Sequence, residues 1–437
     1  MSRELFGTDG VRGVAGEYPL DTIGTGQIGE AVGTLFAEPG ELVLIGHDPR
    51  ESSPHLVAGL AAGVTATGAN VEVVGVIPTP GLAYLTRESD AAAGIMVTAS
   101  HNKYSDNGVK VFDRTGGKLT DETETTMNGM ITGGVAGRGS FGSWLHSTER
   151  VVGYENFLVA SAEGTDLTGM RIAVDSANGA ASGIAARVFT RLGADVMAVA
   201  DKPDGRNINA GCGATHTEML EETVVENGLD LGVALDGDAD RLMLVDGLGR
   251  KFDGDHIMYT LATAGGHDGV VATVMTNLGA EQAMRGNGID VIRAGVGDRY
   301  VLEGLRESGY RLGGEQSGHI ILPERLATGD GMLAAIQAIR AVRESGLSLA
   351  EWRDQVELLP QALVNIPVPD KRLLGHESVR AYIDEVTDRL GGNGRVLIRP
   401  SGTEPLARVM VESPDAHEAA MAAAAGLERL LAGLSSR

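Results

Sequence analysis

The sequence is poor in lysine, cysteine and aromatic residues, and it has no long apolar run. Only six of its 36 basic residues are lysines, against 59 aspartates and glutamates, so the formal net charge is −23. No basic stretch is present that could neutralise the phosphates of nucleic acid or of an anionic membrane, so neither is an expected partner. Scarce lysine with abundant acid favours a halophilic protein, because concentrated salt screens surface self-repulsion. An acidic mesophilic enzyme is the alternative.

The single cysteine and the lack of apolar segments bear on the compartment. Cys212 has no second cysteine with which to form an intramolecular disulfide. No apolar stretch reaches the roughly 18 residues that span a bilayer. Residues 1–20 show no charged-then-apolar signal pattern, and Asp9 and Arg12 interrupt them. We therefore expect a cytoplasmic protein.

The sequence does contain a repeated pattern: a β-branched apolar run, then a glycine-rich turn, then an amphipathic helix. Its 437 residues are too many for one ordinary core. The pattern predicts strands at 41–46, 70–76, 171–175, 195–199, 269–274 and 290–293, and helices at 54–68, 179–192 and 278–285. Strands that alternate with helices favour βαβ units. We expect an α/β fold of three related α/β domains with mainly parallel mixed sheets, plus a small C-terminal α+β domain.

Breaks in this pattern divide the chain into four predicted domains. Residues 133–142 carry five glycines, and further breaks fall near residues 250–255 and 358–369. In the last domain an Ala-rich helix at 416–431 is apolar around much of its surface, so we expect it to dock on a sheet. The predicted domains are residues 1–145, 146–250, 251–360 and 361–437.

Three carboxylates at alternating positions form a candidate metal site. Asp236, Asp238 and Asp240 lie between two apolar runs, so a short loop between strands would direct them to one point. Oxygen donors at that density favour Mg²⁺ or another hard cation. An EF-hand is excluded, since Arg241 and Gly247 stand where that loop needs Gly and Glu. A solvated acidic turn is the alternative, but Arg241 is well placed to hold a metal-bound phosphate.

A serine follows the strand-like run 95–98 and is a candidate nucleophile. Ser100 should lie at the C-terminal end of that strand, where ligands gather in open α/β sheets. An ordinary loop serine or N-cap is the alternative, and no G-x-S-x-G elbow surrounds it. His101 is either a base or a loop hydrogen-bonder. Lys110, in the strand-like run 109–112, is either functional or solvated.

Three further loops are rich in small polar residues. Residues 399–405 form a tight turn with Arg399, two hydroxyls and nearby Arg408, which suits a phosphate clamp. Residues 313–319 are a Gly-bracketed polar turn that could grip sugar hydroxyls. Residues 295–299 lack the third glycine of a dinucleotide fingerprint, and no phosphate-binding G-x-x-x-x-G-K-[ST] occurs, so a nucleotide-dependent kinase is disfavoured.

Four of these loops occur in a defined order along the whole chain. Together they resemble the signatures of the α-D-phosphohexomutase superfamily, at residues 98–102, 236–241, 314–319 and 399–405. Residues 5–13, 203–209 and 212–216 are most similar to the phosphoglucosamine mutases, as is Gln316, where the hexose enzymes more often carry Met. Lys103 departs from the superfamily, which usually has Pro after His-Asn. We expect this change to alter the stiffness of the serine loop without removing the nucleophile.

The resemblance implies roles for the individual residues. The catalytic residues would be Ser100, which holds a phosphoryl group, His101, Lys110 as acid/base and Arg241. The ligands of one Mg²⁺ would be Ser100, Asp236, Asp238 and Asp240. The substrate-binding residues would be Arg12 beside the phosphoserine loop, Glu315, Ser317 and His319 on sugar hydroxyls, and Arg399, Ser401, Gly402, Thr403 and Arg408 on the non-transferring phosphate.

The activity implied by the resemblance is interconversion of glucosamine 6-phosphate and glucosamine 1-phosphate, with a hexose 1,6-bisphosphate as activator and intermediate. The partner would be a small-molecule sugar phosphate, and the protein would be a monomer or homodimer. The alternatives are a phosphomannomutase/phosphoglucomutase, a metal-dependent sugar phosphatase and a non-catalytic sugar-phosphate binding protein.

The net charge of −23 predicts that salt raises the stability of this protein. Lowering the salt from 1 M to 0.1 M lengthens the Debye distance from about 3 Å to about 10 Å, so repulsion acts over more carboxylate pairs. Thermal melts recorded from dilute buffer to molar KCl should therefore rise steadily. A flat or falling melting temperature would identify an acidic mesophilic enzyme instead.

Overall fold

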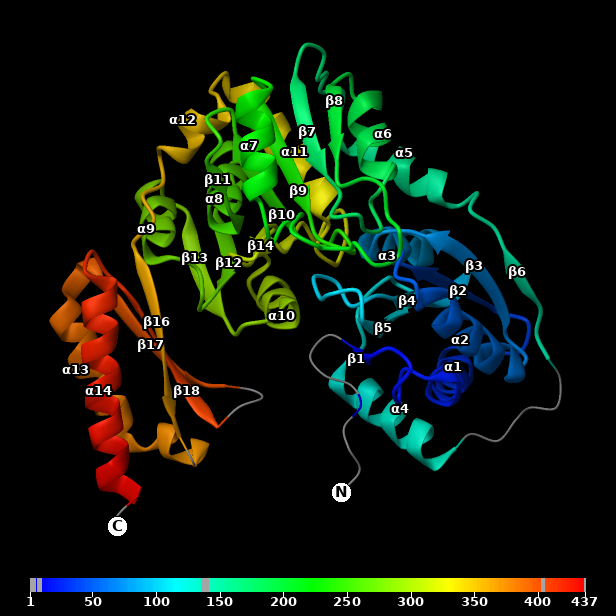
Figure 1. The fold of residues 1–437 in the computed structure, drawn as a ribbon, viewed down its shortest axis with the longest axis horizontal. Coiled ribbons are helices and arrows are strands. Elements are labelled where there is room, and N and C mark those ends of the chain that lie inside the picture. The colour runs from blue at the N-terminus through cyan, green and yellow to red at the C-terminus, as the bar shows by residue number, and fades with distance from the viewer. Residues whose placement is uncertain (1–4, 6–9, 135–140, 369, 402–404, 436–437) are drawn as a thin grey trace. The chain divides into compact units, whose positions relative to one another are not determined.

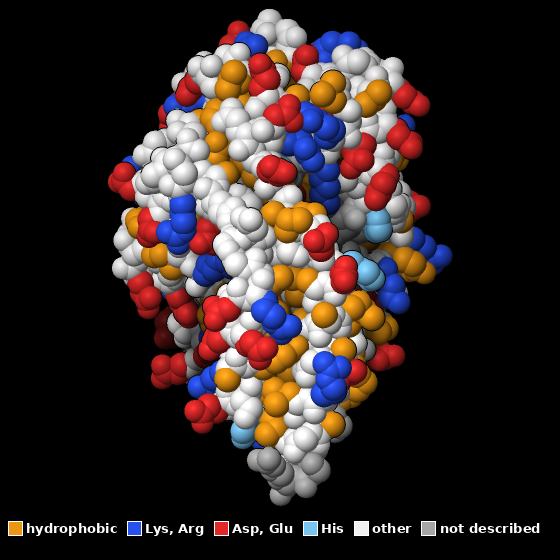
Figure 2. All heavy atoms as spheres, turned by 90° about the vertical axis from the view of Figure 1, so that its left-hand side faces the viewer, with side chains coloured by type: hydrophobic (Ala, Val, Ile, Leu, Met, Phe, Trp, Pro, Cys, Tyr) orange, Lys and Arg blue, Asp and Glu red, His pale blue; other side chains and the backbone are white. Residues whose placement is uncertain are grey.

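The computed structural model describes residues 5, 10–134, 141–368, 370–401 and 405–435 of the chain (Figure 1). These residues form two compact units, which we describe separately. The first contains Met1–Met275 and Asn287–Asp354, and the second contains Thr276–Gly286 and Gln355–Arg437. Among the described residues, no helix is both long enough and apolar enough to cross a membrane. Acidic side chains are spread over the face shown in Figure 2 rather than gathered in one patch.

The first sheet of the first unit is mixed, with strand order β1-β5-β4-β2-β3-β6. Strands β2, β3, β4 and β6 are parallel, whereas β5 is antiparallel to both β4 and β1. The strands are β1 (Val11–Val14), β2 (Leu42–His47), β3 (Asn70–Val76), β4 (Ala91–Val97), β5 (Asp106–Asp113) and β6 (Trp144–His146). The associated helices are α1 (Thr22–Phe36), α2 (Ser53–Ala66), α3 (Thr79–Glu88) and α4 (Asp121–Gly133).

Two further sheets of the first unit repeat this plan of parallel strands followed by an antiparallel edge. The second sheet has the order β11-β10-β9-β7-β8, with β7 (Arg171–Asp175), β8 (Asp195–Val199), β9 (Leu231–Leu235), β10 (Leu242–Asp246) and β11 (Lys251–Phe252). The third has the order β13-β12-β14-β15, with β12 (Gly269–Thr273), β13 (Asp290–Ala294), β14 (Gly313–Gly314) and β15 (Ile320–Ile321). The accompanying helices are α5 (Val151–Ser161), α6 (Ile184–Arg191), α7 (Glu218–Glu226), α8 (Gly254–Ala264), α10 (Asp298–Ser308), α11 (Gly331–Ser345) and α12 (Leu349–Arg353).

The second unit is built on an antiparallel sheet of order β16-β18-β17. Its C-terminal helix buries Ala420, Ala423, Ala424 and Leu427 against that sheet, as the apolar surface of the helix predicts. The elements are β16 (Gln361–Pro367), β17 (Arg395–Pro400), β18 (Leu406–Glu412), α9 (Leu278–Gly286), α13 (Glu377–Leu390), α14 (Ala416–Ser435) and the 3₁₀ turns η1 (Lys371–Gly375) and η2 (Gly391–Asn393).

The α/β fold class with its small C-terminal domain is confirmed, and the predicted strands 70–76, 171–175 and 195–199 match β3, β7 and β8. The predicted helix over 179–192 is wrong in its first turn. Gly183 has φ 70°, a left-handed conformation that cannot continue a right-handed helix, so α6 begins at Ile184. Residues 179–183 form turns that pass close to the second sheet's aspartate loop, where Ala180 donates to the carbonyl of Gly237.

Helices α1 and α2 pack against each other on the first sheet (Figure 1). Glycines at their interface allow the two backbones to approach closely. A Cβ added at Gly29 would overlap the carbonyl oxygen of Leu60, and one at Gly63 would overlap that of Gly26. These backbone atoms cannot move without separating the helices. The glycines lower the helix propensity of α1 and α2, but they allow the two backbones to come into contact.

We predict opposite effects for two substitutions one turn apart in α1. Gly29→Ala forces the helices apart and should lower the free energy of unfolding by about 1–3 kcal/mol. A Cβ at Gly26 meets no atom within 4 Å, so Gly26→Ala should instead raise it by up to about 1 kcal/mol through helix propensity. Urea unfolding followed by circular dichroism measures both. Equal effects of the two variants would show that helix contact does not require the glycine.

Candidate active site

Ser100 lies in the loop between β4 and β5, at the C-terminal end of a central parallel strand. Its side chain is buried, and its backbone has φ 52°, a left-handed conformation that non-glycine residues seldom adopt. Its Oγ donates a hydrogen bond to Asp236 Oδ2 at 2.7 Å and lies 3.2 Å from His101 Nδ1. Ser100 is therefore joined directly to the aspartate loop, 136 residues away. The sequence alone identifies this serine from its place at the end of a strand.

The three aspartates occupy the turn between β9 and β10. Asp236 and Asp238 are fully buried and Asp240 is 5% exposed. One oxygen from each carboxylate lies within 4.8 Å of the others, a spacing suited to a shared cation. The alternative of a solvated acidic turn is wrong, because these carboxylates are withdrawn from water.

Burial makes the charges of this cluster interdependent. Burial and the neighbouring Asp240 and Asp238 raise the pKa of Asp236 well above its usual range. Burial also opposes the charge of Asp240, but Lys110, His319 and Arg241 together hold the pKa of Asp240 well below its usual range. One carboxylate of the cluster thus resists ionisation until further positive charge arrives.

Two carboxylate oxygens of the cluster lack a hydrogen bond from the described residues and fit a hard cation. Asp238 Oδ2 accepts from Thr79 Oγ1 at 2.6 Å and from Lys110 Nζ at 3.0 Å. Its other oxygen, Oδ1, is buried and accepts no hydrogen bond from the described residues. Oδ1 of Asp240 also lacks a hydrogen bond from the described part of the chain, with His319 Nδ1 at 3.7 Å and Arg241 Nε at 3.9 Å as its charged neighbours. Buried carboxylate oxygens are rarely left without a partner. These two, with Asp236, are the atoms that could hold Mg²⁺.

Basic side chains surround the carboxylates. Lys110, 3% exposed on β5, contacts Asp238 and also lies 3.2 Å from Asp240 Oδ2, so it is not a solvated surface residue. Burial opposes the charge of Arg241, but the neighbouring carboxylates raise its pKa above the usual value. Arg12 on β1 contacts the serine loop, where its Nη1 donates to the carbonyl of Ala99 at 3.5 Å.

His101 is held without charge near the serine. Burial, together with the positive charges of Arg241 and Arg12, lowers the pKa of His101 to about 4. The ring is therefore neutral at pH 7, and its Nδ1 can exchange a hydrogen bond with the Ser100 hydroxyl. Of the two roles that the sequence left open, the loop hydrogen bond is the one that the geometry displays.

The predicted sugar-binding residues lie on the β14–β15 turn. Glu315 Oε1 accepts from the backbone N–H of Gly297 at 3.0 Å, and Ser317 Oγ donates to Glu315 Oε2 at 3.3 Å. His319 Nδ1 is 3.7 Å from Asp240, which joins this turn to the aspartate loop. A cavity of about 520 Å³ opens here, lined by polar residues such as Arg241, Glu315 and Ser317 and by the apolar Met243 and Met275 among others.

The predicted phosphate-clamp residues belong to the second unit. Arg399 and Arg408 face each other in the register of β17 and β18, and Ser401 is buried where β17 ends. Burial and the adjacent Arg408 lower the pKa of Arg399. Two such guanidinium groups side by side favour an anion between them. Gly402 and Thr403 lie outside the described residues.

Several polar residues near the site escaped the sequence analysis. Asp48 and Arg50 follow β2, which neighbours β4, and they contact the serine loop. The signal that could have found them is their place at the C-terminal end of a strand beside the serine strand. Residues 295–299, dismissed as a nucleotide fingerprint, have another role, since Asp298 pairs with Lys118 and Arg299 with Asp121.

Comparisons with known proteins agree with this geometry over the length of the chain. The chain matches four domains of the phosphoglucomutase/phosphomannomutase family: alpha/beta/alpha domain I over residues 3–134, domain II over 152–249, domain III over 253–358 and the C-terminal domain over 363–428. A phosphoglucosamine mutase of Thermus thermophilus is 47% identical, with 94% of each chain covered. One of Deinococcus radiodurans is 46% identical, with 95% of each covered.

A solved structure shares the fold at lower identity. A phosphoglucomutase/phosphomannomutase family protein from Burkholderia thailandensis superposes with a TM-score of 0.80 at 23% identity, over 96% of each chain. With matches to all four domains in order and relatives of this identity over nearly its whole length, the chain belongs to the phosphoglucomutase/phosphomannomutase family, within the α-D-phosphohexomutase superfamily.

Proposed function

We propose that this protein is a mutase that interconverts glucosamine 6-phosphate and glucosamine 1-phosphate through a phosphoserine at Ser100 and a 1,6-bisphosphate intermediate. The observation that carries the proposal is the buried hydroxyl of Ser100, hydrogen-bonded to one of three clustered carboxylates. The names of the relatives support the sugar, since proteins 45–47% identical over most of the chain are called phosphoglucosamine mutases.

The proposed reaction is two opposite phosphoryl transfers. The free hydroxyl oxygen of the sugar bonds to the phosphorus on Ser100, and the bond from phosphorus to Ser100 Oγ breaks. The bisphosphate then turns end for end, and Ser100 Oγ takes the other phosphoryl group while the sugar oxygen leaves. Lys110, buried beside Asp238 and Asp240, would exchange the proton of the reacting hydroxyl. No phosphate is gained or lost overall.

Charge stabilisation is the main catalytic need of such a transfer. Asp236, Asp238 and Asp240, with an oxygen of the group on Ser100, would hold one Mg²⁺. When bound, the cation would neutralise charge on the transferring group. A related fold, an Aspergillus fumigatus N-acetylphosphoglucosamine mutase of TM-score 0.68 and 19% identity, was solved with its sugar phosphate and magnesium. Arg241, at the edge of the same cluster, would hold the phosphoryl oxygens.

Substrate binding is divided among the domains in this proposal. The domains would be residues 1–145 for the phosphoserine loop, 146–250 for the metal, 251–360 for the sugar and 361–437 for the second phosphate. Glu315, Ser317 and His319 would hold sugar hydroxyls. Arg399, Ser401, Gly402, Thr403 and Arg408 would hold the phosphate that is not transferring, in either orientation of the sugar. A cytoplasmic monomer or homodimer completes the proposal.

A side-by-side assay tests the function. Glucosamine, glucose and mannose 6-phosphates, each with its 1,6-bisphosphate, Mg²⁺ and molar KCl, should give the highest kcat/KM for the glucosamine compound. Its C2 ammonium can pair with acceptors on Glu315 and Gln316, and loss of such a charged hydrogen bond costs roughly 1.5–3 kcal/mol, or about tenfold to a hundredfold. A preference for mannose or glucose phosphate would place the protein with the phosphomannomutase/phosphoglucomutase enzymes.

The same assay includes Ser100→Ala as its control. This variant should lose all turnover yet melt as the wild type does, and intact-mass measurement should find a phosphate on the wild-type serine only. Release of inorganic phosphate as the main product would identify a phosphatase. Near-normal isomerisation by Ser100→Ala would rule out the phosphoserine route.

We predict that Asp238→Asn weakens Mg²⁺ binding at least about tenfold, because it replaces an anionic ligand whose free oxygen faces the cluster. Calorimetric titration of Mg²⁺ into the protein without substrate measures this directly. Asp195→Asn, which removes one exposed carboxylate from β8, is the matched control and should bind as the wild type does. Equal affinities for all three proteins would contradict the proposed metal site.

A further inference from the structure

The serine loop has an unusual backbone that needs external support. Ser100 has φ 52°, and the carbonyl groups of Ser100, Asn102, Lys103 and Asp106 converge on one point instead of pairing with a neighbouring strand. A chain in this conformation relaxes unless its surroundings hold it. The position of Ser100 Oγ therefore depends on whatever occupies that point.

The guanidinium of Arg50 occupies it. Its Nη2 donates to the carbonyls of Ser100 at 3.0 Å and Asn102 at 2.8 Å, and its Nη1 donates to those of Asp106 at 3.1 Å and Lys103. Arg50 is 1% exposed, which makes it one of the largest fully buried side chains described in the molecule. A planar fork of five N–H groups can serve four carbonyls at once, whereas an ammonium has three donors at a single point.

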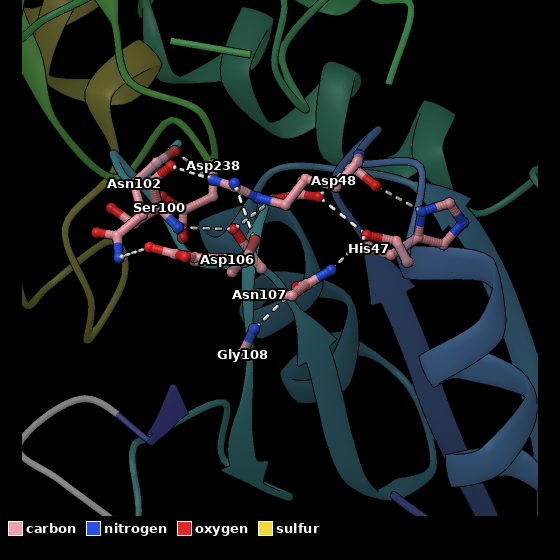
Figure 3. A network of polar contacts seen from close by, with 12 residues as sticks. His47, Asp48, Ser100, Asn102, Asp106, Asn107, Gly108 and Asp238 are labelled. Carbon is pink, nitrogen blue, oxygen red and sulfur yellow. Dashed lines mark hydrogen bonds and ion pairs between the residues drawn. The ribbon is translucent and has the colours of Figure 1, made fainter. Parts of the chain in front are cut away.

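Asp48 fixes Arg50 and also reaches the other side of Ser100. Its Oδ2 accepts from Arg50 Nε at 2.8 Å and from Thr98 Oγ1 at 2.8 Å, and Thr98 Oγ1 accepts from the Ser100 N–H at 2.9 Å. The Asp48–Arg50 pair thus holds both the amide and the carbonyl of the serine, one through Thr98 and one directly. Figure 3 shows Asp48, Ser100, Asn102 and Asp106 joined in this network.

The second sheet's domain reinforces the same carbonyls. Asn209 Nδ2 donates to Ser100 O at 2.9 Å and to Asn102 O at 3.1 Å. The loop carbonyls are therefore held from the domain that carries the serine and from the domain that carries the aspartates. This double hold keeps Ser100 Oγ at hydrogen-bond distance from Asp236 Oδ2.

We propose that Arg50, held by Asp48, is a positioning residue for phosphoryl transfer: it locks the serine loop in its left-handed turn and thereby aims the phosphoserine at the sugar rather than at water. The proposal rests on the proposed mutase function. Within the described residues, the side chain of Arg50 hydrogen-bonds only to loop carbonyls and to Asp48, so it acts through Ser100 and contributes nothing to sugar affinity. A misplacement of about 1 Å at a reacting atom costs on the order of a hundredfold in rate.

The test compares Arg50→Lys with Arg150→Lys in the full-length protein. Arg150 also holds a buried carboxylate in the first sheet, with its Nε 2.8 Å from both oxygens of Glu72, but the described contacts do not join it to the serine loop. Arg50→Lys should lower kcat by about tenfold to a hundredfold while KM changes by less than about threefold. Arg150→Lys should keep both constants.

The decisive measurement is the fate of the phosphoryl group. With ³²P on Ser100, the ratio of inorganic phosphate released to sugar phosphate isomerised should rise about tenfold in Arg50→Lys and stay constant in Arg150→Lys. A merely structural arginine would lower the melting temperature and the amount of active protein, and with it the apparent kcat, but it would leave that ratio unchanged. An unchanged ratio in folded Arg50→Lys would overturn the proposal.

A second variant covers the case in which Arg50→Lys does not fold. Thr98→Val preserves shape and removes only the hydroxyl that links Asp48 to the Ser100 amide. It should also raise the phosphate-to-isomer ratio with little change in KM, and a wild-type ratio would overturn the proposal. If the wild type itself isomerises no sugar phosphate, the mutase function fails first, so the two failures are distinguishable.

Discussion

The constraint on which the site depends is the burial of three carboxylates around one serine. Like charges at this distance and depth cannot all ionise without nearby positive charge. The structure answers with Lys110 and Arg241, and with His319 close to Asp240. These partners come from three different sheets and their loops, so the balance of charge exists only when the three α/β domains of the first unit are assembled. The site therefore forms only when the first unit is folded.

Much of this arrangement could be predicted, because the sequence signals for Ser100 and Asp236 lie within a few residues of each of them. Ser100 and Asp236 each follow an apolar strand, and strand ends gather ligands in such sheets. The place of Arg50 after β2 could have marked it as a residue near the site, but its contacts could not be predicted, because its partners are four carbonyl groups some 50 residues away and backbone carbonyls leave no mark in a sequence. The predicted start of α6 was wrong for a related reason, since the N–H of the left-handed Gly183 donates to Asp201, 18 residues away, and the helical pattern does not show this contact.

One neutral and one charged side chain together fix the orientation of the Asp238 carboxylate. Thr79 and Lys110 both bind Oδ2, which leaves Oδ1 for another use. A carboxylate that is fixed through one oxygen presents the other in a constant direction, and outer hydrogen bonds of this kind tune metal sites generally. Because Thr79 begins α3 in the first sheet's domain, the orientation of an aspartate in the second is set from across the domain boundary.

The second compact unit takes residues 276–286 from the middle of the chain as well as the C-terminal segment. Within it, Asn277 Nδ2 donates a hydrogen bond to the carbonyl of Leu359, and the N–H of Leu278 donates one to Glu412 Oε2. The last domain is thus not a module that evolution or an engineer could exchange at one junction. A chimera that swaps residues 355–437 alone would set a foreign sheet against a native α9, and a workable exchange must carry both segments together. Recombination between relatives should respect the same three crossings of the chain.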